Sequence, residues 1–161
     1  MRIELEIGAG PQLIPGIRDA LETLTRTNVR YLRSHPRTPL LYRAPVEYQM
    51  EPIGAEHWAD VPTVLGQGWG DCEDLAAWRA AELRLLGYPN AYAFPIELGM
   101  GPMVAGGPSV RLIHILVSRG GCDLSQVEDP SSILGMPRVP SHVMRQAVRA
   151  ECDARVGRWS R

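Results

Sequence analysis

The sequence predicts an α+β fold, with helices near both ends of the chain and a small, mostly antiparallel sheet. Apolar side chains recur with the helical period over residues 11–32, 72–86 and 139–156. Residues 91–98 and 110–118 are instead typical of strands, and no helical pattern separates them. The chain also holds 16 glycines and 14 prolines, which favours turns and long loops over a helical bundle.

Size and charge limit the possible functions. A chain of 161 residues suits one domain, residues 1–161, that can bury a real core. Its formal net charge of −1 gives no bulk attraction to nucleic acid or to acidic membranes. Glycine and proline interrupt the longest uncharged stretches, so we expect no transmembrane helix. Neither nucleic acid nor a membrane is therefore expected as a partner.

The cysteines and the first residues bear on the cellular compartment. Cys72, Cys122 and Cys152 are an odd, scattered set, which favours reduced thiols over a disulfide scaffold. Residues 1–7 carry three charged side chains and lack the pattern of a secretory signal. Both observations predict a cytoplasmic protein.

The first half of the chain combines one long helix with a poorly periodic stretch. Residues 2–7 alternate polar and apolar side chains and predict a short strand. The helix over 11–32 carries an apolar stripe and ends before Pro36. Residues 36–70 are rich in proline and glycine, so we expect a long surface connection with a short helix near 61–65.

The clearest helix spans residues 72–86. Acidic residues open it, which suits the positive N-terminal end of a helix. One of its faces carries Cys72, Ala76, Ala80 and Leu83. Because three of these side chains are small, this face is predicted to pack closely against a sheet.

The second half of the chain supplies that sheet. Residues 99–108 are rich in glycine and methionine and predict a loop between the strands 91–98 and 110–118. A further short strand is expected to reach Val127. A final amphipathic helix is expected over 139–156.

Cys72 stands where a nucleophile would be expected. The positive end of the helix dipole favours a thiolate, and the neighbouring glycines would let a substrate backbone come close. The flanking acids Asp71, Glu73 and Asp74 act in the opposite direction, because negative charge disfavours a thiolate. A reactive Cys72 therefore needs a neighbouring cation, for which an imidazolium is the natural candidate.

His114 is the best candidate for that base. It lies mid-strand between Ile113 and Ile115, so alternation places its side chain on the face opposite to theirs. A carboxylate on an adjacent strand would hold the ring in one tautomer. Asp129 follows 15 residues later, past a Gly-Gly turn, and is favoured over Asp123. A buried histidine and an aspartate before proline also have purely structural uses.

The residues around Cys72 carry a family resemblance. They read Trp58-x-Asp60-x-Pro62-x-x-Leu65-x-x-Gly68-x-Gly70-Asp71-Cys72-Glu73-Asp74-x-Ala76. This run is similar to the transglutaminase-like superfamily, and its Gly-Asp-Cys-Glu-Asp core especially resembles bacterial transglutaminase-like cysteine proteinases. The Ile-His-Ile-Leu-Val strand and the Glu-Asp-Pro-Ser segment follow in the matching order. The resemblance covers about residues 55–135.

This resemblance implies a papain-like fold, in which the catalytic helix packs on a sheet that carries the His and then the Asp. The matching positions for a catalytic triad are Cys72, His114 and Asp129. In calcium-dependent members of the group, acids beside the Cys are linked to metal binding, and Asp71 and Glu73 match those positions. The resemblance thus implies calcium as an optional cofactor, while the triad chemistry itself requires none.

Two further residues are candidates for the substrate cleft. Gln67 lies a few residues before Cys72 in the sequence, as the oxyanion-hole glutamine of papain-like enzymes lies before their catalytic cysteine. The number of residues between the two is not the same as in papain. Trp69, in a glycine-rich stretch, could wall the cleft. The backbone N–H of Cys72 is a further oxyanion donor, since N–H groups at a helix start are free. Trp58 and Trp78 are expected in the core.

The function expected from these residues is hydrolysis of peptide or amide bonds through a thioester acyl-enzyme, with a protein or peptide as substrate. Transglutaminase-type acyl transfer to an amine is one alternative, because water access decides between the two outcomes. A non-catalytic binding or structural module on the same fold is the other, because fold alone does not establish activity.

Overall fold

The computed structural model describes residues 2–3, 13–51, 57–102, 109–121 and 123–159. They form a mixed α+β fold with a small antiparallel sheet, which confirms the predicted class at that level. The elements are, in chain order, β1 (Arg2–Ile3), α1 (Leu13–Ser34), the 3-10 helix η1 (Leu41–Arg43), β2 (Glu47–Tyr48), β3 (Trp58–Ala59), α2 (Val61–Gln67), β4 (Trp69–Gly70), α3 (Cys72–Leu85), β5 (Tyr92–Pro102), β6 (Ser109–Ser118), the 3-10 helix η2 (Leu124–Gln126), β7 (Val127–Glu128), α4 (Pro130–Ile133) and α5 (Ser141–Trp159).

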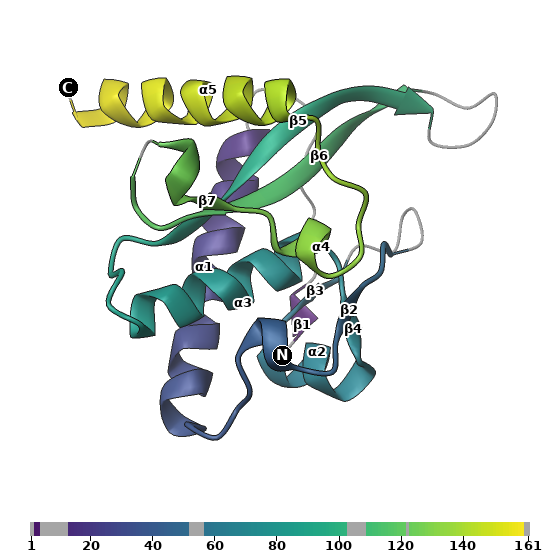
Figure 1. The fold of residues 1–161 in the computed structure, drawn as a ribbon, viewed down its shortest axis with the longest axis vertical. Helices are drawn as coiled ribbons and strands as arrows, with labels where there is room; N and C mark the ends of the chain where they lie inside the picture. Colours follow the sequence, from purple (N-terminus) through teal and green to yellow (C-terminus); the bar gives the residue numbers. More distant parts are fainter. Residues whose placement is uncertain (1, 4–12, 52–56, 103–108, 122, 160–161) are drawn as a thin grey trace.

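The main sheet lies between two groups of helices (Figure 1). α1 and α3 cross each other and cover one face, while α5 runs along the other. Ala76 and Ala80 of α3 pack with Ile115 of β6 in one core, which confirms the predicted packing face of this helix. On the opposite face, Leu116 packs with Val148 of α5. The side chains of β6 thus alternate between two cores.

The sheet has the strand order β5–β6–β7, and both pairings are antiparallel. β5 and β6 pair along almost their whole length, with Ile96 opposite His114. A bulge lies between Glu97 and Gly99, where Gly99 takes a φ of 124° that favours glycine. β7 pairs with only the last two residues of β6. It therefore leaves the edge of β6 beside His114 to other elements.

The two long strands extend further than the sequence predicts. A loop was expected over residues 99–108, but β5 continues to Pro102 and β6 begins at Ser109. Residues 103–108 lie outside the described part of the chain. Pairing between two long strands outweighs the glycine-rich composition here, because the bulge absorbs the irregular backbone.

The described residues between 36 and 70, which are 36–51 and 57–70, contain more regular structure than the predicted surface connection. Helix α2 confirms the short helix expected near 61–65. η1, β2, β3 and β4 are additional, and Leu41 is buried in a second core with Val61 and with Trp78 of α3. The prediction was wrong because this core is made of short elements, none of them long enough to show a period.

The remaining boundaries lie close to those predicted. α1 ends at Ser34, and α5 begins at Ser141, directly after a proline. Of the strand predicted over 2–7, residues 2–3 pair with β3, and the others lie outside the described part. The described residues contain no helix that is both long and apolar enough to cross a membrane.

Candidate active site

Two glycines shape the backbone that leads to Cys72. Gly68 ends α2 with a φ of 80°, a conformation that other residues rarely adopt. Gly70 is buried, and a Cβ added there would lie 3.2 Å from Cβ of Asp74 and 3.3 Å from the side chain of Leu75. Gly70 therefore allows β4 to pack against α3. The role of the neighbouring glycines in admitting a substrate backbone stays a prediction.

Cys72 is partly buried at the first position of α3, and its thiol donates a hydrogen bond to Oε2 of Glu73 at 3.3 Å. Burial raises the pKa of the thiol well above its usual range, and the charges of Glu73 and Asp71 raise it further. Both acids are themselves buried. Burial and the two neighbouring negative charges act in the same direction, so the resting thiol is protonated.

His114 and Asp129 form the hydrogen-bonded pair expected from the sequence. Nε2 of His114, a residue only 2% exposed, lies 3.0 Å from Oδ1 of Asp129. Ser132 donates its backbone N–H and its hydroxyl to the same carboxylate, at 3.1 and 2.6 Å. Burial raises the pKa of Asp129, but the hydrogen bonds from His114 and Ser132 outweigh it and lower the pKa overall. The alternative Asp123 is exposed and bonds to Ser125 instead.

The ionised Asp129 decides how the imidazole can act. A carboxylate only accepts hydrogen bonds, so Nε2 carries the proton that points at it. In a neutral ring, Nδ1 then has a free lone pair and can accept a proton. In the described part of the chain this Nδ1 makes no hydrogen bond. His114 is thus held in the tautomer that a general base needs.

The edge of β6 that pairs with β7 continues past the point where β7 ends, and backbone N–H groups of β6 still point to it there. Arg119 donates its backbone N–H across this edge to Gln126 at 2.8 Å. Alternate residues of an antiparallel strand direct their N–H groups to the same side. The N–H of Ile115 therefore points to the same edge, past the point where β7 ends.

The sulfur of Cys72 lies at this position. The sulfur packs against the core that includes Ile115, whose backbone is close enough to lower the pKa of the thiol slightly, which places the sulfur beside β6 and next to the residue that carries the imidazole. Asp129 approaches His114 along the same edge, directly after β7. Within the described residues no hydrogen bond joins the sulfur to the imidazole, and the thiol donates to Glu73 instead. The structure thus brings His114 and Asp129 into contact and leaves Cys72 protonated at the same edge.

Tyr48 is a residue of the site that the sequence analysis missed. It lies in β2 opposite Gly70, and its backbone N–H donates to the carbonyl of Leu134 at 2.9 Å. Burial raises its pKa to about 12, and the charges of nearby carboxylates, Asp129 included, add to this effect. Its hydroxyl thus remains a donor at neutral pH. A single tyrosine in a proline-rich stretch gave no signal of this position.

Gln67 and Trp69 lie on the approach to the helix. The exposed amide of Gln67 donates to the backbone carbonyl of Trp69 at 2.7 Å, and no hydrogen bond joins it to Cys72. The oxyanion role of Gln67 and the cleft role of Trp69 stay predictions. Trp58 and Trp78 are buried, as predicted for core residues.

The acids that the resemblance links to calcium, Asp71 and Glu73, are buried beside the thiol. Within the described ranges, no three His, Cys, Asp or Glu side chains converge into a group that could hold a metal ion. The calcium role of Asp71 and Glu73 stays a prediction.

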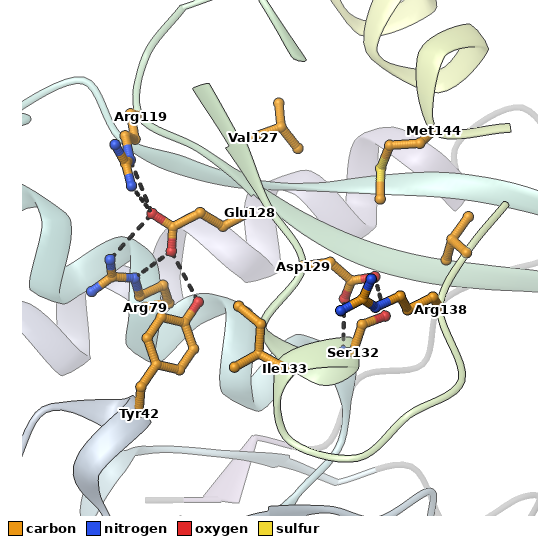
Figure 2. A pocket seen from close by; sticks show the side chains of 11 residues that line it. Tyr42, Arg79, Arg119, Val127, Glu128, Asp129, Ser132, Ile133, Arg138 and Met144 are labelled. Atoms are coloured by element: carbon orange, nitrogen blue, oxygen red, sulfur yellow. Dashed lines mark hydrogen bonds and ion pairs between the residues drawn. The ribbon is translucent and has the colours of Figure 1, made fainter. Parts of the chain in front are cut away.

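A cavity of about 520 Å³ adjoins the acid of the pair (Figure 2). Asp129 and Ser132 line it on one side and Glu128 on another. Its remaining walls are partly apolar, with Ile133 and Met144 among them. The cavity offers room for a side chain next to the histidine–aspartate pair.

Neutralising Glu73 should make the thiol more acidic. We expect Glu73→Gln to lower the apparent pKa of Cys72, because it removes the negative charge that raises this pKa most but leaves the burial unchanged. The measurement is the pH dependence of iodoacetamide labelling at Cys72, read by mass spectrometry. Glu97→Gln, at an exposed position of β5, is the matched control and should leave the profile unchanged. An identical profile in both variants would contradict this electrostatic account.

Comparison with models of known protein families, with curated proteins and with solved structures gives no significant match for this chain. The resemblance to transglutaminase-like proteinases therefore depends on the residues quoted from the sequence. The geometry at the edge of β6 is the independent structural observation beside it.

Proposed function

We propose that this chain is a cysteine-dependent hydrolase of amide or peptide bonds, built on a papain-like, transglutaminase-like fold. Cys72 is the nucleophile, His114 the general base and acid, and Asp129 the residue that orients the imidazole. The observation that supports this best is the 3.0 Å bond between Nε2 of His114 and Asp129, beside the edge where the sulfur of Cys72 lies. That bond leaves Nδ1 as the proton acceptor.

Acylation of Cys72 is the first half of the reaction. The sulfur attacks the carbonyl carbon of the substrate while its proton moves to Nδ1 of His114, which forms a C–S bond and an oxyanion. The backbone N–H of Cys72, at the start of α3, donates to that oxyanion. The C–N bond then breaks, and the imidazolium of His114 gives its proton to the leaving amine. A thioester remains on Cys72.

Hydrolysis of the thioester completes the cycle. Water adds to the thioester carbonyl while Nδ1 of His114 takes one of its protons. The C–S bond breaks, the carboxylic acid leaves, and the proton returns from His114 to the sulfur. An amine in place of water would give acyl transfer by the same steps, so access of water to the thioester determines the outcome.

The protonation state of the Cys72 thiol affects the first step. Because the thiol of Cys72 is protonated and donates to Glu73, His114 removes the proton during attack and not before it. This differs from a preformed thiolate–imidazolium pair, which the thiol pKa disfavours. The same observation favours the second candidate function, a non-catalytic module, since a protonated, hydrogen-bonded thiol is a weak nucleophile.

Digestion of a complex peptide mixture tests the proposal. Wild-type protein and Cys152→Ala should generate the same new peptide ends, whereas Cys72→Ala should generate none, because the nucleophile is lost. Mass spectrometry of the peptide ends is the measurement, and added methylamine reports acyl transfer as methylamide products. Unchanged cleavage by Cys72→Ala would contradict the mechanism, and absence of cleavage by every protein would favour the non-catalytic module.

A further inference from the structure

A cluster of charged side chains holds the residue that precedes Asp129. The carboxylate of Glu128 accepts hydrogen bonds from Arg79, at 2.7 and 3.1 Å, and from Arg119, at 2.7 and 2.9 Å. The hydroxyl of Tyr42 donates to the same carboxylate at 2.9 Å. Figure 2 shows these three side chains converging on Glu128. We call Arg79, Arg119, Tyr42 and Glu128 the Glu128 clamp.

The Glu128 clamp ties β7 to two other elements. Arg79 belongs to α3, where it also donates to Glu82 at 3.0 Å, and its guanidinium lies 4.8 Å from the ring centre of Tyr42 in η1. Burial raises the pKa of Glu128, but the bonds from Arg79 and Arg119 outweigh it and lower the pKa to about 2. The carboxylate of Glu128 therefore stays ionised at neutral pH.

β7 needs this side-chain anchor because its backbone provides little. It has two residues and pairs with only the last two residues of β6. Successive side chains of a strand point to opposite faces, so Glu128 faces α3 while Asp129 turns to His114. Fixing Glu128 on α3 thereby fixes the backbone from which Asp129 extends.

The anchor also sets a distance that matters for the reaction. Arg79 and Cys72 belong to the same helix, α3. The ion pair between Arg79 and Glu128 therefore holds Asp129 at a fixed position relative to the nucleophile. The imidazole that Asp129 binds is held with it. Neither Arg79 nor Glu128 needs to touch a substrate for this effect.

We infer that Glu128 and Arg79 are positioning residues of the active site, which act by fixing β7 on α3 so that Asp129 holds His114 in line with Cys72. This inference rests on the proposed function for its catalytic consequence. The bond between His114 and Asp129 gives it a separate structural consequence that can be measured without turnover.

A second buried ion pair in the chain supplies a matched control. Arg18 of α1 donates to both carboxylate oxygens of Glu151 in α5, one of them at 2.7 Å, and Glu151 is only 4% exposed. Neither residue is hydrogen-bonded to His114 or Asp129 in the described structure. Glu128→Gln and Glu151→Gln each remove one carboxylate that is bonded to arginine, but only the first belongs to the Glu128 clamp.

The experiment compares these two variants in the full chain. Release of nitrophenolate from p-nitrophenyl acetate gives kcat and KM, and thermal unfolding gives stability. We expect both variants to lose stability, and Glu128→Gln alone to lower kcat about 10- to 100-fold with KM changed less than twofold. Arg79→Lys keeps the charge but not the two-bonded geometry, so its kcat should lie between those of wild type and Arg79→Gln.

Proton NMR of the His114 ring provides the readout that is independent of catalysis. The Nε2–H signal, shifted downfield by its bond to Asp129, should weaken or disappear in Glu128→Gln and persist in Glu151→Gln. If Glu128→Gln matches Glu151→Gln in both kcat and this signal, the inference is wrong. If wild type shows no turnover, the proposed function fails, while the NMR comparison still decides whether the Glu128 clamp positions His114.

Discussion

Replacing His114 with alanine should slow the acylation of Cys72 by p-nitrophenyl acetate about 10²- to 10⁴-fold, the usual contribution of a positioned general base. The thiol is protonated at rest, so attack requires a base to take its proton in the same step. In the proposed mechanism Nδ1 of His114 is that base, because Nε2 is engaged with Asp129. The measurement is the rate of nitrophenolate release at neutral pH.

The control for this loss is His142→Ala. His142 is exposed at the start of α5 and is 28 residues from His114 in the sequence. Its removal should leave the rate unchanged. Imidazole added to the solution should partly restore activity to the His114 variant, because it can enter the space left by the ring. A His114→Ala protein as fast as wild type would contradict the assignment of the base.

The second large effect concerns stability at Asp74. This side chain is fully buried, and its Oδ1 accepts the backbone N–H of Ala59 at 2.6 Å, which ties β3 to the start of α3. Burial, and next the charge of Asp71, raise its pKa from 3.8 to about 9. Between these two values the folded state binds a proton that the unfolded state has lost. Stability therefore falls as pH rises through this window, by at most about 1.4 kcal/mol per pH unit.

Asp74→Asn should remove this pH dependence. Asparagine keeps the size of the side chain and an oxygen for the N–H of Ala59, but it cannot ionise. We expect urea unfolding to show wild type and variant converging near pH 4, with the variant increasingly more stable up to pH 9. Asp19→Asn, at an exposed position of α1, is the control and should follow wild type. Parallel stability curves for wild type and Asp74→Asn would show that Asp74 is not held neutral in the fold.

The parts of this architecture with a local period were predictable. α3 was predicted from its acidic start and its face of small side chains, and β6 from its apolar run. The pairing of His114 with Asp129 followed from their separation by one turn, because adjacent antiparallel strands bring such residues together. These features depend on residues close in the sequence.

The features that escaped prediction depend on contacts between distant segments. Tyr48 reaches the site through a two-residue strand, which is too short to show any alternation. The charge of Glu128 gave no sign that Arg79, 49 residues earlier, would bind it. The thiol pKa likewise depends first on the burial of Cys72, which its position in the sequence does not determine.

Thioester formation on Cys72 can be detected by acid quenching of the reaction with p-nitrophenyl acetate, followed by peptide mass spectrometry. The chain contains no lysine, so side-chain amines cannot take up the acetyl group in competition. The account predicts acetyl on Cys72 in wild type, none on the partly buried Cys152, and little on Cys72 in His114→Ala. Equal acetylation of Cys72 and Cys152, unchanged by loss of His114, would contradict it.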